Sequence, residues 1–183
     1  MDDRIDLFEK LVRFLAIKPL NEEAFNLEKA KEIIKEENKE NISFIAQHGY
    51  FEDVLDTVEQ RIGNLQPHAG TLYIYIKGDS SKKTIERNLL NLVLYVNQIY
   101  IVGKASDWSF NDPKINFLDI EDKFTPNHQR FLIFNSPSYN VALTARHIEQ
   151  KGETVTEGAL TNKKEAVTFL NQVLAPFSYK KNY

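Results

Sequence analysis

The sequence predicts an α+β domain in which a mixed β-sheet packs against helices, and two observations lead to that fold class. Segments in which apolar and polar residues alternate, such as 71–77, are interspersed with segments whose apolar residues recur every three to four positions, such as 50–62. The stretch 89–104 is strongly apolar, which suits a central part of the sheet that is covered on both faces. We therefore expect strands near 42–46, 71–77, 84–97, 99–104 and 131–134, and helices near 50–62, 139–150 and 162–174.

The first forty residues predict two further helices. Apolar residues between Ile5 and Leu15 fall on one helical stripe, and Pro19 ends this helix. A second helix begins after Asn21 and runs to about Lys39, with glutamates in its first turn that favour the helix dipole. We interpret residues 1–40 as a helical appendage and residues 41–183 as the main domain.

The main domain begins with a short strand at 42–46 and a helix that Gly63 ends. A clear strand follows at 71–77. The next strand is expected at 84–97 because apolar residues then occupy every second position: Leu90, Leu92, Leu94 and Val96. A turn at Asn97 and Gln98 leads to another apolar strand at 99–104.

The second half of the chain predicts one short strand near 107–110 and an irregular segment from 114 to 129 that includes a helical piece. A buried strand at 131–134 then stops at a turn. We expect Tyr139 to open a helix that Gly152 ends, and Asn162 with Glu165 to start the last helix.

Composition excludes several classes of site. Of the 183 residues, 42% are hydrophobic and 27% are charged, as in an ordinary globular protein. The chain has no cysteine, and its four histidines lack metal-ligand spacing, so we expect no metal, cofactor or disulfide. The net charge of −3 means that an RNA partner would be bound through a local patch. No apolar run approaches the length of a membrane span. The first residues do not resemble a signal peptide, which predicts a cytoplasmic protein unless a leader has been removed.

Two segments resemble the parts of ribosome-inactivating proteins, of the ricin A-chain and Shiga-toxin type, that carry the active-site tyrosines. They are 97–103 (Asn-Gln-Ile-Tyr-Ile-Val-Gly) and 134–139 (Phe-Asn-Ser-Pro-Ser-Tyr), and the resemblance extends over about 42–174. It implies a ribosome-inactivating-protein-like fold that lacks its C-terminal part. It also implies an rRNA N-glycosylase that removes an adenine from a ribosomal RNA loop, which blocks translation.

The resemblance assigns the site residues. Tyr100 and Tyr139 would face each other across one cleft and sandwich the adenine, each stacking contact contributing about 1–3 kcal/mol. Backbone groups of Ile101, Ser136 and Pro137 would bind the edge of the base. Pro137 has no N–H, so its contact would come from a carbonyl.

The family's catalytic Glu and Arg, one helical turn apart on a later helix, have no counterpart before Tyr183. Three interpretations remain open: a truncated toxin, a pseudoenzyme that keeps the adenine slot, or a rearranged site. In a rearranged site Glu9 and Arg13, four residues apart, would imitate the pair, although a surface ion pair is the simpler interpretation. The alternative functions are a non-catalytic sensor or interaction module and an immunity or decoy protein.

Overall fold

A computed structural model describes residues 4–17, 24–36, 41–46, 49–66, 68–76, 82–125 and 129–178. These residues form five helices and one mixed seven-stranded sheet, which confirms the expected α+β class. The helices are α1 (Leu7–Leu15), α2 (Leu27–Ile34), α3 (Tyr50–Gly63), α4 (Lys82–Leu92) and α5 (Lys164–Ser178). The strands are β1 (Asn41–Ala46), β2 (Thr71–Tyr75), β3 (Gln98–Val102), β4 (Ile115–Leu118), β5 (Arg130–Asn135), β6 (Asn140–Gln150) and β7 (Glu153–Thr161).

The sheet has a parallel half and an antiparallel half, in the order β1-β7-β6-β5-β2-β3-β4. Strands β2, β3 and β4 run parallel, and α4 forms the crossover from β2 to β3. Strands β5, β6, β7 and β1 pair antiparallel, and β5 joins the two halves by pairing antiparallel with β2. The edges of the sheet are therefore β1 and β4.

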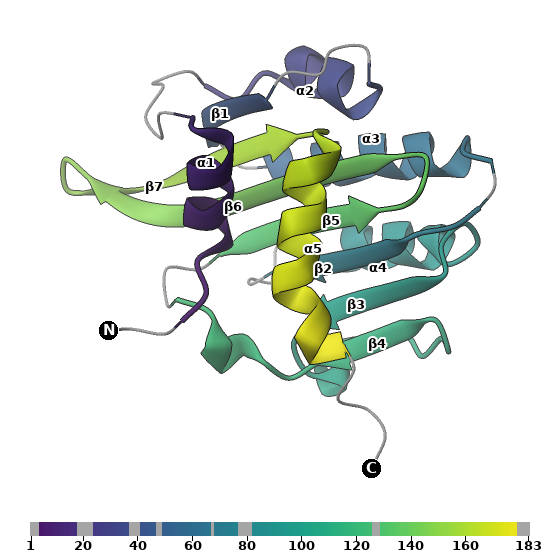
Figure 1. Ribbon diagram of the computed structural model, residues 1–183. Coiled ribbons are helices and arrows are strands. Elements are labelled where there is room, and N and C mark those ends of the chain that lie inside the picture. The colour runs from purple at the N-terminus through teal and green to yellow at the C-terminus, as the bar shows by residue number, and fades with distance from the viewer. Residues whose placement is uncertain are drawn as a thin grey trace.

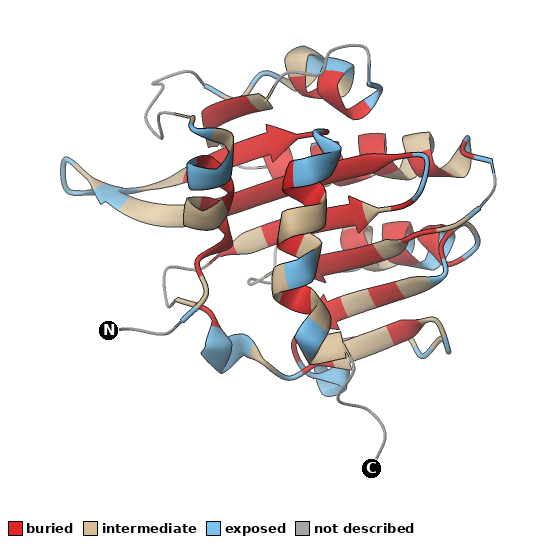
Figure 2. Cartoon of the chain, in the orientation of Figure 1, coloured by how far each residue is buried: buried red, intermediate tan, exposed pale blue. Residues whose placement is uncertain are grey.

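Helices cover both faces of the sheet (Figure 1). Alternation along β2 separates the two faces: Leu72 and Ile74 pack in one apolar cluster, and Tyr73 and Tyr75 pack in the other. We call the face under α1 and α5 the front face, and the face under α2, α3 and α4 the rear face. Figure 2 shows that burial runs along the central strands, between the two helical layers.

The strand expected at 84–97 is wrong, because the chain forms helix α4 and a turn there. Ile85, Leu89 and Leu92 are fully buried on the rear face, at helical spacing. Leu90 and Leu94, which a strand would have buried with Leu92, are 46% and 67% exposed. The leucine-rich run fits both periodicities, and packing against α3 selects the helix.

The helix expected at 139–150 is also wrong, because these residues form strand β6. Both faces of β6 are covered, so its buried residues are nearly continuous and mimic a helical pattern. Gly152 does not end a helix. Lys151 and Gly152 both have positive φ, 53° and 81°, and form the two-residue turn of a hairpin between β6 and β7.

Strands β4 and β7 were not expected. The short strand expected at 107–110 is absent from the structure, where a 3-10 turn at Ala105–Asp107 precedes extended chain. The expected strands at 42–46, 71–77, 99–104 and 131–134 are confirmed as β1, β2, β3 and β5, and the helices at 50–62 and 162–174 as α3 and α5.

The two N-terminal helices are present as α1 and α2, with Asp6 and Asn26 as their N-caps. The second helix begins at Leu27, so its expected start after Asn21 is wrong. Residues 18–23 and 37–40, at the expected limits of the second helix, lie outside the described residues. Both helices pack into the layers of the main sheet, α1 in the front cluster and α2 in the rear cluster, so they are not a separate appendage. In the described part of the chain, no helix is both long and apolar enough to cross a membrane.

Candidate functional site

Tyr100 lies on the front face, at the centre of β3. Its ring stacks on that of Tyr73, its register partner on β2, with centroids 4.9 Å apart and planes at 17°. The hydroxyl of Tyr73 is in turn 2.7 Å from Oγ of Ser178, at the end of α5. Tyr100 therefore faces the helix α5 layer.

Tyr139 lies on the rear face. Its side chain is fully buried in the rear cluster, and the Arg61 guanidinium carbon lies 5.2 Å from the centre of its ring. Burial raises the pKa of the Tyr139 phenol well above its usual range. Tyr139 does not open a helix, since it precedes strand β6. Tyr100 and Tyr139 are thus separated by the sheet, and the expected slot between their rings is wrong.

The other residues expected to bind the base serve the fold. Ile101 lies on β3, paired to Ile74 on one side and Phe117 on the other. The Ser136 hydroxyl accepts a hydrogen bond from the Tyr139 N–H at 2.9 Å and lies 2.8 Å from the Tyr139 carbonyl. Pro137 is exposed in the same turn. These residues build the β5–β6 turn and the parallel half of the sheet.

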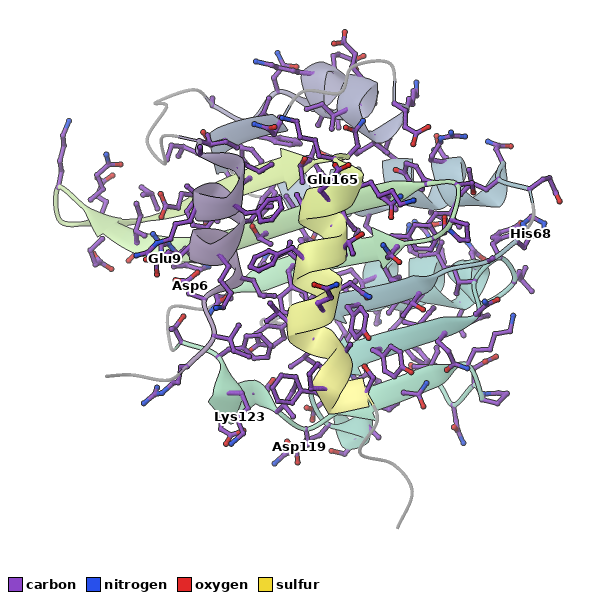
Figure 3. All side chains as sticks on the ribbon, viewed as in Figure 1. Asp6, Glu9, His68, Asp119, Lys123 and Glu165 are labelled. Carbon is purple, nitrogen blue, oxygen red and sulfur yellow. The ribbon has the colours of Figure 1, made fainter. Side chains whose placement is uncertain are left out.

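A groove lined by both charged and aromatic side chains lies on the front face. It has a volume of about 810 Å³ and lies between the N-terminal segment, α1, α5 and residue 125. Figure 3 shows Asp6 and Glu9 together at the start of α1, in front of the sheet. The groove is lined by Arg4, Asp6, Glu9, Lys10, Arg13, Phe14, Thr125 and Phe169.

The chain segments next to the groove are fixed by contacts between distant parts of the sequence. Ile5 forms a parallel β-bridge with Phe124, and its N–H donates to the carbonyl of Lys123 at 2.7 Å. Gln129 accepts from the N–H of Leu7 at 2.9 Å and donates to the carbonyl of Ile5 at 2.8 Å. The first residues of α1 are therefore held in place by the segment that precedes β5.

A buried ion triad supports one wall of the groove. Arg146 on β6 donates to Asp6 at 2.6 Å and to Glu157, its register partner on β7, at 2.7 Å. Its guanidinium carbon also lies 4.7 Å from the centre of the Phe8 ring. Burial opposes the charge, but hydrogen bonds to Glu157 and Asp6 outweigh it and raise the pKa of Arg146 above its usual range. Asp6 also accepts from the N–H of Glu9, so the triad and the N-cap of α1 share one carboxylate.

The open side of the groove combines cations with an aromatic platform. Phe14 and Phe169 stack with ring centroids 4.9 Å apart, and Phe14 is 46% exposed. Arg13 forms an ion pair with Glu9. Lys10 forms no ion pair with a described residue. The groove lining therefore carries three cationic and two anionic side chains, and one of these anions is already neutralised by Arg146.

The sequence did not predict that most of the residues lining this groove lie together. Glu9 and Arg13 were named, but only as a possible imitation of a catalytic pair. Arg146 and Glu157 had a local signal: with a hairpin turn at 151–152 the two residues pair directly across the strands. No local signal joins Phe14 to Phe169, since α1 and α5 meet only in the folded chain.

The described histidines give no metal site. His68 lies close to the ring of Tyr95, at a centroid distance of 5.1 Å, and His147 lies on β6. His48 and His128 lie outside the described residues. Among the described residues, no group of three or more His, Asp or Glu side chains is placed to hold a metal ion.

In comparisons with known proteins, no family model matches this chain, and no curated protein or solved structure matches it.

Proposed function

We propose that this chain is a non-catalytic binding module for single-stranded RNA, and that the front groove holds one purine nucleotide of the bound strand. The observation that carries the proposal is the exposed ring of Phe14, which stacks on the half-buried Phe169 at the side of a groove lined by three cations. An exposed aromatic ring next to cationic side chains matches both parts of a nucleotide. The base stacks on the ring, and the phosphates contact the cations.

Each group has a distinct role in this proposal. Phe14 supplies the stacking surface, and Phe169 holds the Phe14 ring in position. Lys10 binds phosphate as a point charge, and Arg13 leaves its surface pair with Glu9 to donate two parallel hydrogen bonds. The acidic net charge of the chain is no obstacle, because the binding charges are concentrated on one face.

The test is the affinity of the full chain for a fluorescent adenine-rich RNA strand, measured by anisotropy at two salt concentrations. Phe14→Ala should weaken binding by about 5- to 150-fold, the equivalent of one stacking contact of 1–3 kcal/mol. Leu90→Ala is its matched control, since Leu90 is equally exposed but lies on α4 behind the sheet. Lys10→Glu should weaken binding and flatten its salt dependence, whereas Lys83→Glu on α4 should change neither. Equal losses for Phe14→Ala and Leu90→Ala would contradict the proposal.

A second candidate is the rRNA N-glycosylase, in the rearranged form that the sequence left open. The specific observation in its favour is that the Glu9–Arg13 pair lines the groove beside Asp6. A carboxylate beside a bound nucleotide is able to stabilise the ribosyl oxocarbenium ion, and an arginine is able to stabilise charge on a departing adenine.

Release of adenine from intact ribosomes separates the two candidates. The binding module binds RNA and releases no adenine. The enzyme releases adenine, and Glu9→Gln reduces the rate by about 10²–10³-fold while Glu28→Gln, in the exposed Glu28–Lys31 pair of α2, leaves it unchanged. Absence of release from the wild-type chain would rule out this activity for residues 1–183.

A further inference from the structure

Glu9 is the less committed of the two carboxylates that line the front groove. The other, Asp6, accepts hydrogen bonds from Arg146 and from the N–H of Glu9. The Glu9 side chain accepts from Arg13 through one oxygen, and its second oxygen accepts no hydrogen bond from a described residue. Because this side chain is 46% exposed and lines the groove, it is accessible to a molecule bound there.

The pair between Glu9 and Arg13 opens when RNA binds as proposed above, and this inference rests on that proposed function. The Arg13 side chain is 78% exposed, so breaking the pair costs little. Once Arg13 donates to phosphate, Glu9 loses the hydrogen bond that it accepts from Arg13. A carboxylate that is covered by a bound nucleotide and has no donor is unfavourable. The nucleotide itself must therefore supply the replacement donors.

The position of Glu9 on α1 directs these donors to the base. Glu9 precedes Phe14 by five residues, which separates their Cα atoms by about 7.5 Å along the helix axis. Both side chains line the same groove, so the edge of a purine stacked on Phe14 can meet the Glu9 carboxylate. The phosphates lie elsewhere, because a carboxylate repels them and the cations of Lys10 and Arg13 attract them.

The edge of guanine is the one that suits a carboxylate. Guanine presents two neighbouring N–H donors on its Watson–Crick edge, at N1 and at the N2 amino group, and they match the two acceptor oxygens of a carboxylate. Adenine and cytosine each present one amino donor beside a ring nitrogen that is an acceptor. Uracil presents one N–H between two carbonyl oxygens. In these three bases the neighbouring acceptors repel a carboxylate.

We propose that Glu9 makes the front groove selective for guanine over adenine, by accepting hydrogen bonds from N1–H and from the N2 amino group of a guanine stacked on Phe14. Stacking does not choose between the purines, since every base has an aromatic face. Glu9 is therefore the specificity-determining residue, while Phe14 and the cations supply the affinity. Because Glu9 is partly exposed, we expect a preference of about 5- to 20-fold, in the lower part of the range for a bidentate contact to a base.

The experiment measures the affinity of the full chain for three fluorescent strands by anisotropy. Each is a short uridine strand with one central guanosine, inosine or adenosine. The wild type should bind the guanosine strand about 5- to 20-fold more tightly than the adenosine strand. Inosine keeps N1–H but lacks the N2 amino group, so its strand should bind with intermediate affinity.

Glu9→Gln should abolish the preference for guanosine or reverse it. A glutamine amide carries one acceptor and one donor side, which match the N6 amino group and a ring nitrogen of adenine. The adenosine strand should then bind at least as tightly as the guanosine strand. Glu28→Gln, in the exposed Glu28–Lys31 pair of α2, is the matched control and should keep the guanosine preference.

The possible outcomes separate guanine selectivity from RNA binding itself. Equal affinity of the wild type for the guanosine and adenosine strands, lost in Phe14→Ala, would overturn the selectivity and leave the RNA-binding module standing. A guanosine preference that Glu9→Gln retains would also overturn it, by placing the selecting group elsewhere. Absence of binding to all three strands would overturn the proposed function and the selectivity together.

Discussion

The charged side chains on the two faces of the sheet have different kinds of hydrogen-bond partner. On the front face, Arg146 bonds to both Asp6 and Glu157, so the chain supplies its own counter-charge. On the rear face, Asp56 and Glu59 share only neutral amide donors. The front face therefore uses an internal ion triad to hold α1 on the sheet, whereas the rear face is mainly an apolar layer with one hydrogen-bonded polar cluster between α3 and α4.

Removing the front-face cation should have the largest effect on stability. Arg146→Met leaves two buried carboxylates without their shared donor, and we expect the free energy of unfolding to fall by about 3–5 kcal/mol. Urea denaturation at pH 7 measures this change. The control is Arg13→Met, which breaks an exposed ion pair and should cost less than about 1 kcal/mol. Equal effects would mean that the triad does not hold the front face together.

On the rear face, a leucine pair in α4 tests the helix directly. Leu89→Ala should lower the free energy of unfolding by about 2–5 kcal/mol, because Leu89 is fully buried. Leu90→Ala should change it little, because Leu90 is about half exposed. If Leu90→Ala lowered the free energy of unfolding more than Leu89→Ala, the result would favour the predicted strand over helix α4.

Gly158 tests how tightly the rear face is packed. It lies opposite Phe44 across β1 and β7, and an added methyl group would lie 2.5 Å from a carbon of the Phe44 ring. Gly158→Ala should therefore cost about 1–3 kcal/mol in denaturant unfolding. Gly63→Ala is the control, since its methyl group would meet Tyr95 at an ordinary 3.5 Å. A neutral Gly158→Ala would indicate a looser rear core than the structure shows.

The smallest effect is expected for Tyr139→Phe. The buried Tyr139 hydroxyl has no hydrogen-bond partner among the described residues, so its removal should change stability by less than about 1 kcal/mol at pH 7 and should not weaken RNA binding. A loss of RNA affinity in this variant would instead indicate that Tyr139 contacts the RNA.

Tyr139→Phe also tests how the buried Tyr139 phenol affects the stability of the protein at alkaline pH. Because burial raises the pKa of Tyr139 in the folded chain, the unfolded chain loses this proton first, near its ordinary pKa of about 10. The wild type should hold its stability below pH 10 and lose it progressively above that value. Tyr139→Phe should show a shallower alkaline loss in urea midpoints measured from pH 8 to 11.

The sequence predicted the elements whose pattern has a single interpretation, and it was wrong where two patterns coincide. Strand β2 alternates cleanly, and α3 has an unbroken helical stripe, so both were found. The leucine-rich segment before β3 fits the period of a helix and the period of a strand equally well, and only its packing against α3 distinguishes the two. Strand β6 is buried on both sides, which removes the alternation that marks a strand.

The site was less predictable than the fold because it depends on register and on distant contacts. Tyr100 and Tyr139 share a face of the sheet only if the alternation of the strands points both side chains the same way. Because the sequence predicted a helix where β6 forms, the face on which Tyr139 lies could not be predicted. The groove joins α1 to α5, at opposite ends of the chain. Only the Arg146–Glu157 pair was accessible in advance, through the two-residue turn at 151–152.

The position of α1 has a consequence for the order in which the protein assembles. This helix is synthesised before the other described elements, yet it packs against α5, β6 and β7, the last three of them. The carboxylate of its N-cap residue, Asp6, pairs with Arg146, which lies 140 residues later in the sequence. The apolar stripe of α1 must therefore stay unburied by its native partners throughout synthesis, and its docking closes the fold as a late, long-range step.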